Sequence, residues 1–127
     1  MKIFILLIII SISVQAKYHK HKHLEKWYQQ KCSKTLNGIQ EYRIKGVRID
    51  ILTKDYAIEV DFAQKSYEGL GQSLYYSIIS NKKPGLILIV ENHRIDLKYV
   101  LRAKRVCIKY KIALWVYENK KLRRIVK

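Results

Sequence analysis

Three carboxylates, a lysine and a glutamine gather in the middle of this 127-residue sequence, at Asp50, Glu59, Asp61, Lys65 and Gln72. Glu59 and Asp61 are two positions apart in an apolar run, so in a strand their side chains share one face of the sheet. Neighbouring carboxylates repel one another. A bound Mg²⁺ or Mn²⁺ ion, which prefers oxygen ligands, would remove this repulsion. The spacing therefore predicts a divalent-metal site beside a phosphodiester. The alternative is that each carboxylate is paired with the abundant Lys and Arg.

Two further patterns bring side chains toward these carboxylates. A hairpin turn at 45–46 would place Glu41 opposite Asp50, and opposed residues share a sheet face. Gln72 and Tyr76 are four apart, so they lie on one face of the helix that follows.

The elements that must position these residues follow from the hydrophobic periodicity. We expect helices over residues 24–32, 66–80 and 96–110, and strands over 39–44, 47–53, 56–61, 86–90, 112–117 and 122–126. Three successive strands followed by a strand–helix–strand crossover predict an α/β domain with a mixed sheet and helices on both faces.

Helical spacing also predicts which faces are buried. In the second helix the buried stripe would be Tyr67, Leu70, Gly71, Leu74 and Ile78. In the third helix, which Asp96 would cap, the inward residues would be Leu97, Val100, Leu101 and Ile108.

The order of elements and the acidic residues resemble the PD-(D/E)XK nuclease superfamily, which has a restriction-endonuclease-like αβββαβ core. The resemblance covers most of residues 24–127 and implies a single nuclease-like domain with a C-terminal helix and strands added. It implies that Asp50 and Glu59 are metal ligands. Gln72 and Tyr76 resemble an extra motif of the exonuclease-like branches, which contacts DNA near the site.

At one position the sequence departs from the family pattern, and at another it leaves two candidate residues. Asp61 stands where the family has its catalytic lysine, and Lys65 would supply that ammonium group from the strand-to-helix junction. Asp61 would then add a metal ligand. The family's additional acidic residue would be either Glu25 or Glu41.

Substrate binding is predicted from charge. The chain carries 26 Lys and Arg against 10 Asp and Glu, a formal net charge of +16, which favours a polyanionic partner. On the third helix one basic stripe is formed by Lys98, Arg102, Arg105 and Lys109. The stripe indicates phosphate contacts, or otherwise an ordinary solvated face.

The first 23 residues look separate from the domain. Lys2, an apolar run and Val14-Gln15-Ala16 are typical of a signal peptide over residues 1–16, with an uncleaved anchor as the alternative. We therefore expect a periplasmic or secreted protein without stable membrane insertion after processing. Residues 17–23 would form a flexible, basic, His-rich tail, and a terminus at 17–19 could bind Cu²⁺ or Ni²⁺.

Cys32 and Cys107 would form a disulfide in an exported protein, unless they are two separate buried thiols. No Ser/His/Asp set, P-loop or zinc-ligand spacing is present. The sequence thus predicts an exported Mg²⁺-dependent nuclease acting on nucleic acid, DNA more readily than RNA. The alternatives are an inactive nucleic-acid-binding protein of the same fold, or a cationic secreted protein that binds anionic membranes or polymers. The oligomeric state, a homodimer included, stays open.

Overall fold

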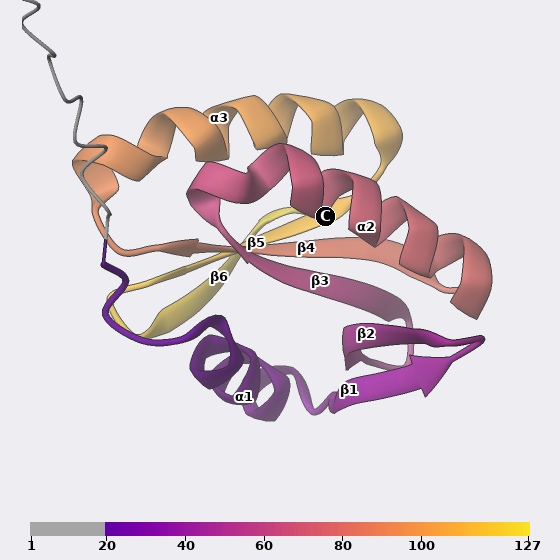
Figure 1. The fold of residues 1–127 in the computed structure, drawn as a ribbon. Coiled ribbons are helices and arrows are strands. Elements are labelled where there is room, and N and C mark those ends of the chain that lie inside the picture. Colours follow the sequence, from indigo (N-terminus) through magenta and orange to yellow (C-terminus); the bar gives the residue numbers. More distant parts are fainter. Residues whose placement is uncertain (1–19) are drawn as a thin grey trace, which may run out of the picture.

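A computed structural model describes residues 20–127. A six-stranded mixed sheet carries α1 (Glu25–Leu36) on one face and both α2 (Ser66–Ser80) and α3 (His93–Tyr110) on the other (Figure 1). The strands, which lie in sequence order across the sheet, are β1 (Ile39–Ile44), β2 (Val47–Leu52), β3 (Tyr56–Phe62), β4 (Lys83–Val90), β5 (Ala113–Glu118) and β6 (Lys121–Val126). β3, β4 and β5 run parallel, and the remaining pairs are antiparallel. The predicted αβββαβ core with a C-terminal helix and strands is confirmed.

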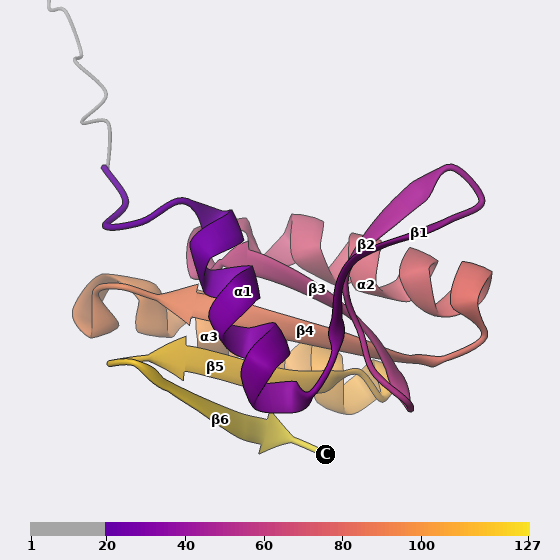
Figure 2. The same cartoon turned by 90° about the horizontal axis from the view of Figure 1, so that it is seen from below.

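The β1–β2 hairpin has the predicted register. Lys45 and Gly46 have φ angles of 48° and 76°, which is the left-handed pair that a tight two-residue hairpin turn requires. The pairs Tyr42–Ile49 and Ile44–Val47 follow from this turn. Figure 2 shows the hairpin projecting away from the rest of the sheet.

Two elements begin earlier than the sequence indicated. β4 includes Pro84, which pairs with Ala57 of β3. α3 begins at His93 and is capped by Asn92, whose side chain accepts a hydrogen bond from the Ile95 amide. The predicted cap Asp96 has another task, because its buried carboxylate accepts hydrogen bonds from the Glu91 and Asn92 amides, both at 3.1 Å.

The predicted buried face of α2 is wrong in part. Leu70 is buried, but Tyr67 and Ile78 are 66% and 76% exposed, and Leu74 is also exposed. The buried side of the helix instead combines the small residues Gly69 and Ser73 with Leu70 and Tyr76. A Cβ atom added at Gly69 would lie 2.8 Å from Leu86 Cδ1. Close approach to β4 therefore selects this face over the more apolar one.

The predicted buried face of α3 is also wrong in part. Val100 is buried as predicted, together with Ala103 and Cys107, which were not among the predicted inward residues of this helix. The remaining predicted core residues are exposed: Leu97, Leu101 and Ile108. The core needs only one narrow side of this helix.

The predicted disulfide does not form. Cys32 and Cys107 are both buried free thiols, and they lie in different core clusters, Cys32 with Tyr28 on α1 and Cys107 with Val100 on α3. Because α1 and α3 cover opposite faces of the sheet, the sheet separates the two sulfur atoms. Burial raises the pKa of each thiol to about 12.

The predicted signal peptide (1–16) and the predicted Cu²⁺ or Ni²⁺ site (17–19) lie outside the described residues. The described part of the His-rich tail packs on the domain. The His21 ring stacks on Phe62 at 3.5 Å, and His21 Nδ1 lies 2.8 Å from Glu91 Oε2. Within residues 20–127, no helix has the length and apolar character needed to cross a membrane.

Candidate active site

A cleft of about 450 Å³ opens between the β1–β2 hairpin, β3, the start of α1 and one side of α2. It is lined by Glu25, Arg43, Gly46, Val47, Arg48, Asp50, Glu59, Gln72 and Tyr76. Five of the residues predicted from sequence thus come together, from four different elements of the fold.

The cleft exists because β2 and β3 separate. Their ladder contains only the pairs Ile51–Ile58 and Leu52–Ala57. Beyond it, the Val60 amide donates its hydrogen bond to Asp50 Oδ2 at 2.9 Å, where a backbone carbonyl would otherwise be the acceptor. The side chain of Asp50 therefore ends the pairing and faces the opening.

Asp50 and Glu59 form a buried acidic pair, each 5% exposed. Burial raises the pKa of Glu59, and the adjacent Asp50 raises it further. Burial also raises the pKa of Asp50, against the opposing effects of the Val60 amide and the Arg48 guanidinium. Among the described residues, Glu59 Oε2 is a buried oxygen with no hydrogen-bond partner. This pair is the strongest candidate for cation binding.

Asp61 and Glu25 form a second acidic pair beside the first. Burial, followed by the charge of Glu25, raises the pKa of Asp61 to about 7, while Lys65 and the Phe62 amide at 3.0 Å act in the opposite direction. The two side chains lie close enough to interact, and burial, followed by the charge of Asp50, raises the pKa of Glu25. Lys65, exposed at the end of the short 3-10 helix Ala63–Lys65, is close enough to affect both carboxyl groups.

Of the two candidates for the additional acidic residue, the structure places Glu25 in the cleft. Glu41 is in the left-handed region at φ 55°, and this interrupts the ladder opposite Asp50. Its carboxylate is instead near Lys26 Nζ at 3.6 Å and Arg48 Nη1 at 3.8 Å. For Glu41, ion pairing with surface cations is the observed state.

Gln72 and Tyr76 line the cleft from α2, as the four-residue spacing predicted. Tyr76 is buried and its hydroxyl faces Glu59. Burial and the charge of Glu59 raise the pKa of Tyr76, so its hydroxyl stays protonated as a donor. Gly69 brings the helix close to the acidic residues, because an added Cβ would lie 3.4 Å from Asp61 Cβ.

Comparison with known proteins gives two distant viral relatives. The chain is similar to two KilA-N domain-containing proteins of Acanthamoeba polyphaga mimivirus, at 29% and 33% identity over 94 residues. Each match covers 74% of this chain but only 26% and 37% of the respective relative. No family model matches the chain. No solved structure matches it significantly.

Within residues 20–127, no three or more His, Cys, Asp or Glu side chains are grouped so that they could hold a metal ion. The pair Asp50 and Glu59 nevertheless fits one, since Mg²⁺ is commonly held by one or two carboxylates together with water. The two carboxyl groups, with one Glu59 oxygen unpartnered, offer the oxygen ligands that such an ion prefers.

The basic stripe on α3 lies outside the cleft. Lys98, Arg102, Arg105 and Lys109 are all exposed, and Lys98 and Arg102 lie over the ring of Tyr99. Its role in nucleic-acid binding stays a prediction.

The cleft also contains two residues that the sequence reasoning missed, Arg43 and Arg48. A signal for Arg48 was present, because it is two positions before Asp50 on one strand and therefore shares its face. Arg43 then follows from the hairpin register, which places it opposite Arg48.

Proposed function

We propose that this protein is a metal-dependent nuclease of the PD-(D/E)XK type, which hydrolyses phosphodiester bonds in nucleic acid, DNA in preference to RNA. The observation that carries the proposal is the buried Asp50–Glu59 pair, which faces an open cleft beside Gln72 and Tyr76 with one carboxylate oxygen unpartnered. Burying two adjacent carboxyl groups, one of them with an unpartnered oxygen, costs folding free energy, and a bound cation would offset part of that cost.

In this proposal Asp50 and Glu59 hold Mg²⁺ or Mn²⁺, which when bound supplies positive charge to the scissile phosphate and lowers the pKa of water. The Tyr76 hydroxyl orients Glu59, and Gln72 orients the nucleotide from α2. Lys65 stabilises the charge that develops on the phosphoryl oxygens.

Asp61 is the departure from the family pattern. It cannot supply an ammonium group, but it lies close enough to Glu25 and Lys65 for their charges to affect its pKa. Asp61 thus positions Lys65 by opposite charge and would contribute to cation binding directly or through water.

The choice of nucleic acid rests on charge and on the relatives. A net charge of +16 favours a polyanion. The similarity to viral proteins that contain a KilA-N domain agrees with a role on DNA, although the match spans only 26% and 37% of their length.

The test is cleavage of supercoiled plasmid and of single-stranded DNA with Mg²⁺, with Mn²⁺ and with chelator. Glu59→Gln and Asp50→Asn should abolish cutting. Asp55→Asn, which removes an exposed carboxylate from the β2–β3 turn, is the matched control and should cut normally. Full metal-dependent cleavage by Glu59→Gln would refute the assignment.

A second candidate is a non-catalytic nucleic-acid-binding protein of the same fold, which Asp61 at the lysine position favours. In that case the wild-type protein would bind DNA in a salt-sensitive manner and cut under none of these conditions. Lys65→Met separates the two functions, because a nuclease should lose activity while it still binds metal.

A further inference from the structure

Arg43 and Arg48 are directly opposed on the β1–β2 hairpin, and both line the cleft. Like charges in opposed positions of an antiparallel pair destabilise a sheet. The hairpin therefore carries a repulsive pair at the mouth of the candidate active site.

Among residues 20–127, this pair is only partly neutralised. Arg48 has one partner at the limit of ion pairing, Glu41 at 3.8 Å, which also pairs with Lys26. Within residues 20–127, no carboxylate lies within ion-pair distance of Arg43. An anion placed between the two guanidinium groups would remove the repulsion.

The position of the pair indicates which anion. Arg48 is two residues from Asp50 on β2, a step of about 7 Å along a strand, and the two side chains share a sheet face. An anion on the arginines would thus lie one short step from a phosphodiester held at Asp50 and Glu59. Guanidinium groups match the phosphate oxygens with paired hydrogen bonds.

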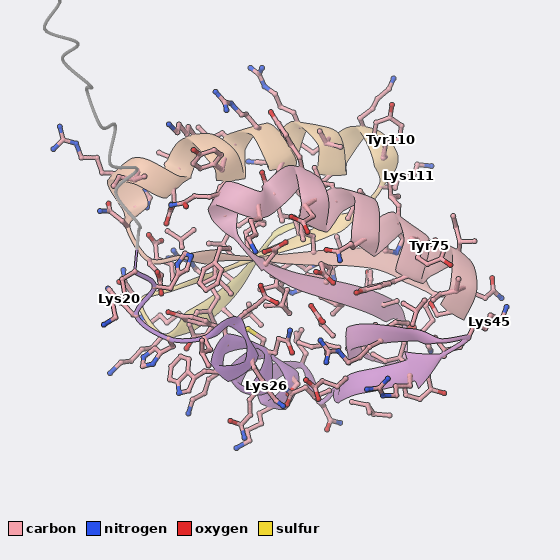
Figure 3. The ribbon with its side chains drawn as sticks, in the orientation of Figure 1. Lys20, Lys26, Lys45, Tyr75, Tyr110 and Lys111 are labelled. Atoms are coloured by element: carbon pink, nitrogen blue, oxygen red, sulfur yellow. The ribbon has the colours of Figure 1, made fainter. Side chains whose placement is uncertain are left out.

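We propose that Arg43 and Arg48 form a phosphate clamp, which binds the nucleic-acid backbone at a phosphate next to the one beside Asp50 and Glu59. The clamp rests on the proposed function for its ligand, nucleic acid, but it does not require cleavage. Lys45 at the tip of the same hairpin extends the basic surface outward (Figure 3). The projecting hairpin would then lie along the bound nucleic-acid strand.

The test is binding of a fluorescent mixed-sequence 20-mer, as single strand and as duplex, measured by anisotropy in chelator over a salt series. The clamp variant is Arg43→Gln with Arg48→Gln. The control is Lys120→Gln with Lys121→Gln, which removes two exposed charges where β5 turns into β6, at the opposite edge of the sheet.

We expect the clamp variant to lose roughly ten-fold or more in affinity, and the slope of log K against log salt to become shallower by about 1.4 to 1.8, as for two lost phosphate contacts. The control should change only slightly in both quantities. Equal losses of affinity in the clamp and control variants would refute the clamp, because binding would then depend on net charge alone.

Two further measurements exclude a damaged hairpin and a simple charge effect. Without nucleic acid, Arg43→Gln should unfold at the same urea concentration as the wild type or a higher one, since it removes repulsion; a lower midpoint would count against the clamp. Arg43→Lys with Arg48→Lys should bind more weakly than wild type, and undiminished binding would show that paired hydrogen bonds are not used.

The clamp and the nuclease can fail independently. Strong clamp-dependent binding without cutting would remove the catalytic assignment and leave the clamp. Metal-dependent cutting by the wild-type protein, together with normal nucleic-acid binding by the clamp variant, would remove the clamp and leave the catalytic assignment.

Discussion

Replacing Glu59 by glutamine should make the metal-free protein more stable at neutral and alkaline pH while it removes the candidate activity. Glu59 is buried next to Asp50, and one of its oxygens has no partner. A glutamine of the same shape carries no charge, and its amide can donate a hydrogen bond to Asp50.

The direction of this change in stability follows from the raised pKa of Glu59. The folded protein keeps a proton on Glu59 above pH 4.5, where the unfolded chain has begun to release it. The folded state then binds more protons than the unfolded state, so the free energy of unfolding falls as the pH rises from about 4.5 upward. Glutamine does not titrate and removes this loss.

The expected gain at pH 8 is about 1–3 kcal/mol, the usual magnitude for a hydrogen bond to a charged group and for an unsatisfied buried polar group. For a domain of this size each kcal/mol shifts Tm by roughly 4–8 °C. At pH 5 the gain should be much smaller, because this pH is close to the ordinary pKa of 4.5 that Glu59 has in the unfolded chain, so keeping its proton in the folded state then costs little.

The assay is urea unfolding at pH 5 and pH 8 in chelator, followed by the fluorescence of the buried Trp115. Asp55→Asn serves as the control and should match the wild type at both values. A Glu59→Gln protein that is less stable than the wild type at pH 8, or a difference that does not depend on pH, would refute this reasoning.

Three other predictions concern packing, thiols and metal. Gly69→Ala should destabilise the fold by about 1–3 kcal/mol, because its methyl group would lie 2.8 Å from Leu86 Cδ1. Gly71→Ala, whose added Cβ would have nothing within 4 Å, should instead stabilise the fold by about 0.5–1 kcal/mol. Urea unfolding measures both changes, and similar effects of the two substitutions would contradict the close packing at Gly69. Cys32 and Cys107 should react with a thiol reagent only after unfolding, and reductant should leave Tm unchanged; a drop in Tm would indicate a disulfide. Mn²⁺ should raise Tm more at pH 8 than at pH 6, because it must displace protons from carboxyl groups with raised pKa; an equal shift at both pH values would place the metal elsewhere.

Local sequence determined the hairpin and the strand faces. The turn at Lys45 and Gly46 sets the β1–β2 register by itself, because its two positive φ angles admit one pairing. Alternation along β3 places Glu59 and Asp61 on one face, and helical spacing places Gln72 and Tyr76 together. These relations depend on residues only a few positions apart.

Longer-range placement could not be determined this way. The choice of Glu25 over Glu41, the separation of β2 from β3 and the distance between Cys32 and Cys107 depend on which elements meet across the sheet. No local pattern encodes the fact that the two cysteines would end on opposite faces.

The faces of α2 show the physical reason most directly. Periodicity favoured the apolar stripe through Tyr67 and Ile78, but α2 buries the side with Gly69 and Ser73. Side-chain volume at the contact with β4, rather than hydrophobicity along the helix, decided which face could approach closely. By itself the sequence determined which residues could take part in the site, and only tertiary packing decided which of them meet.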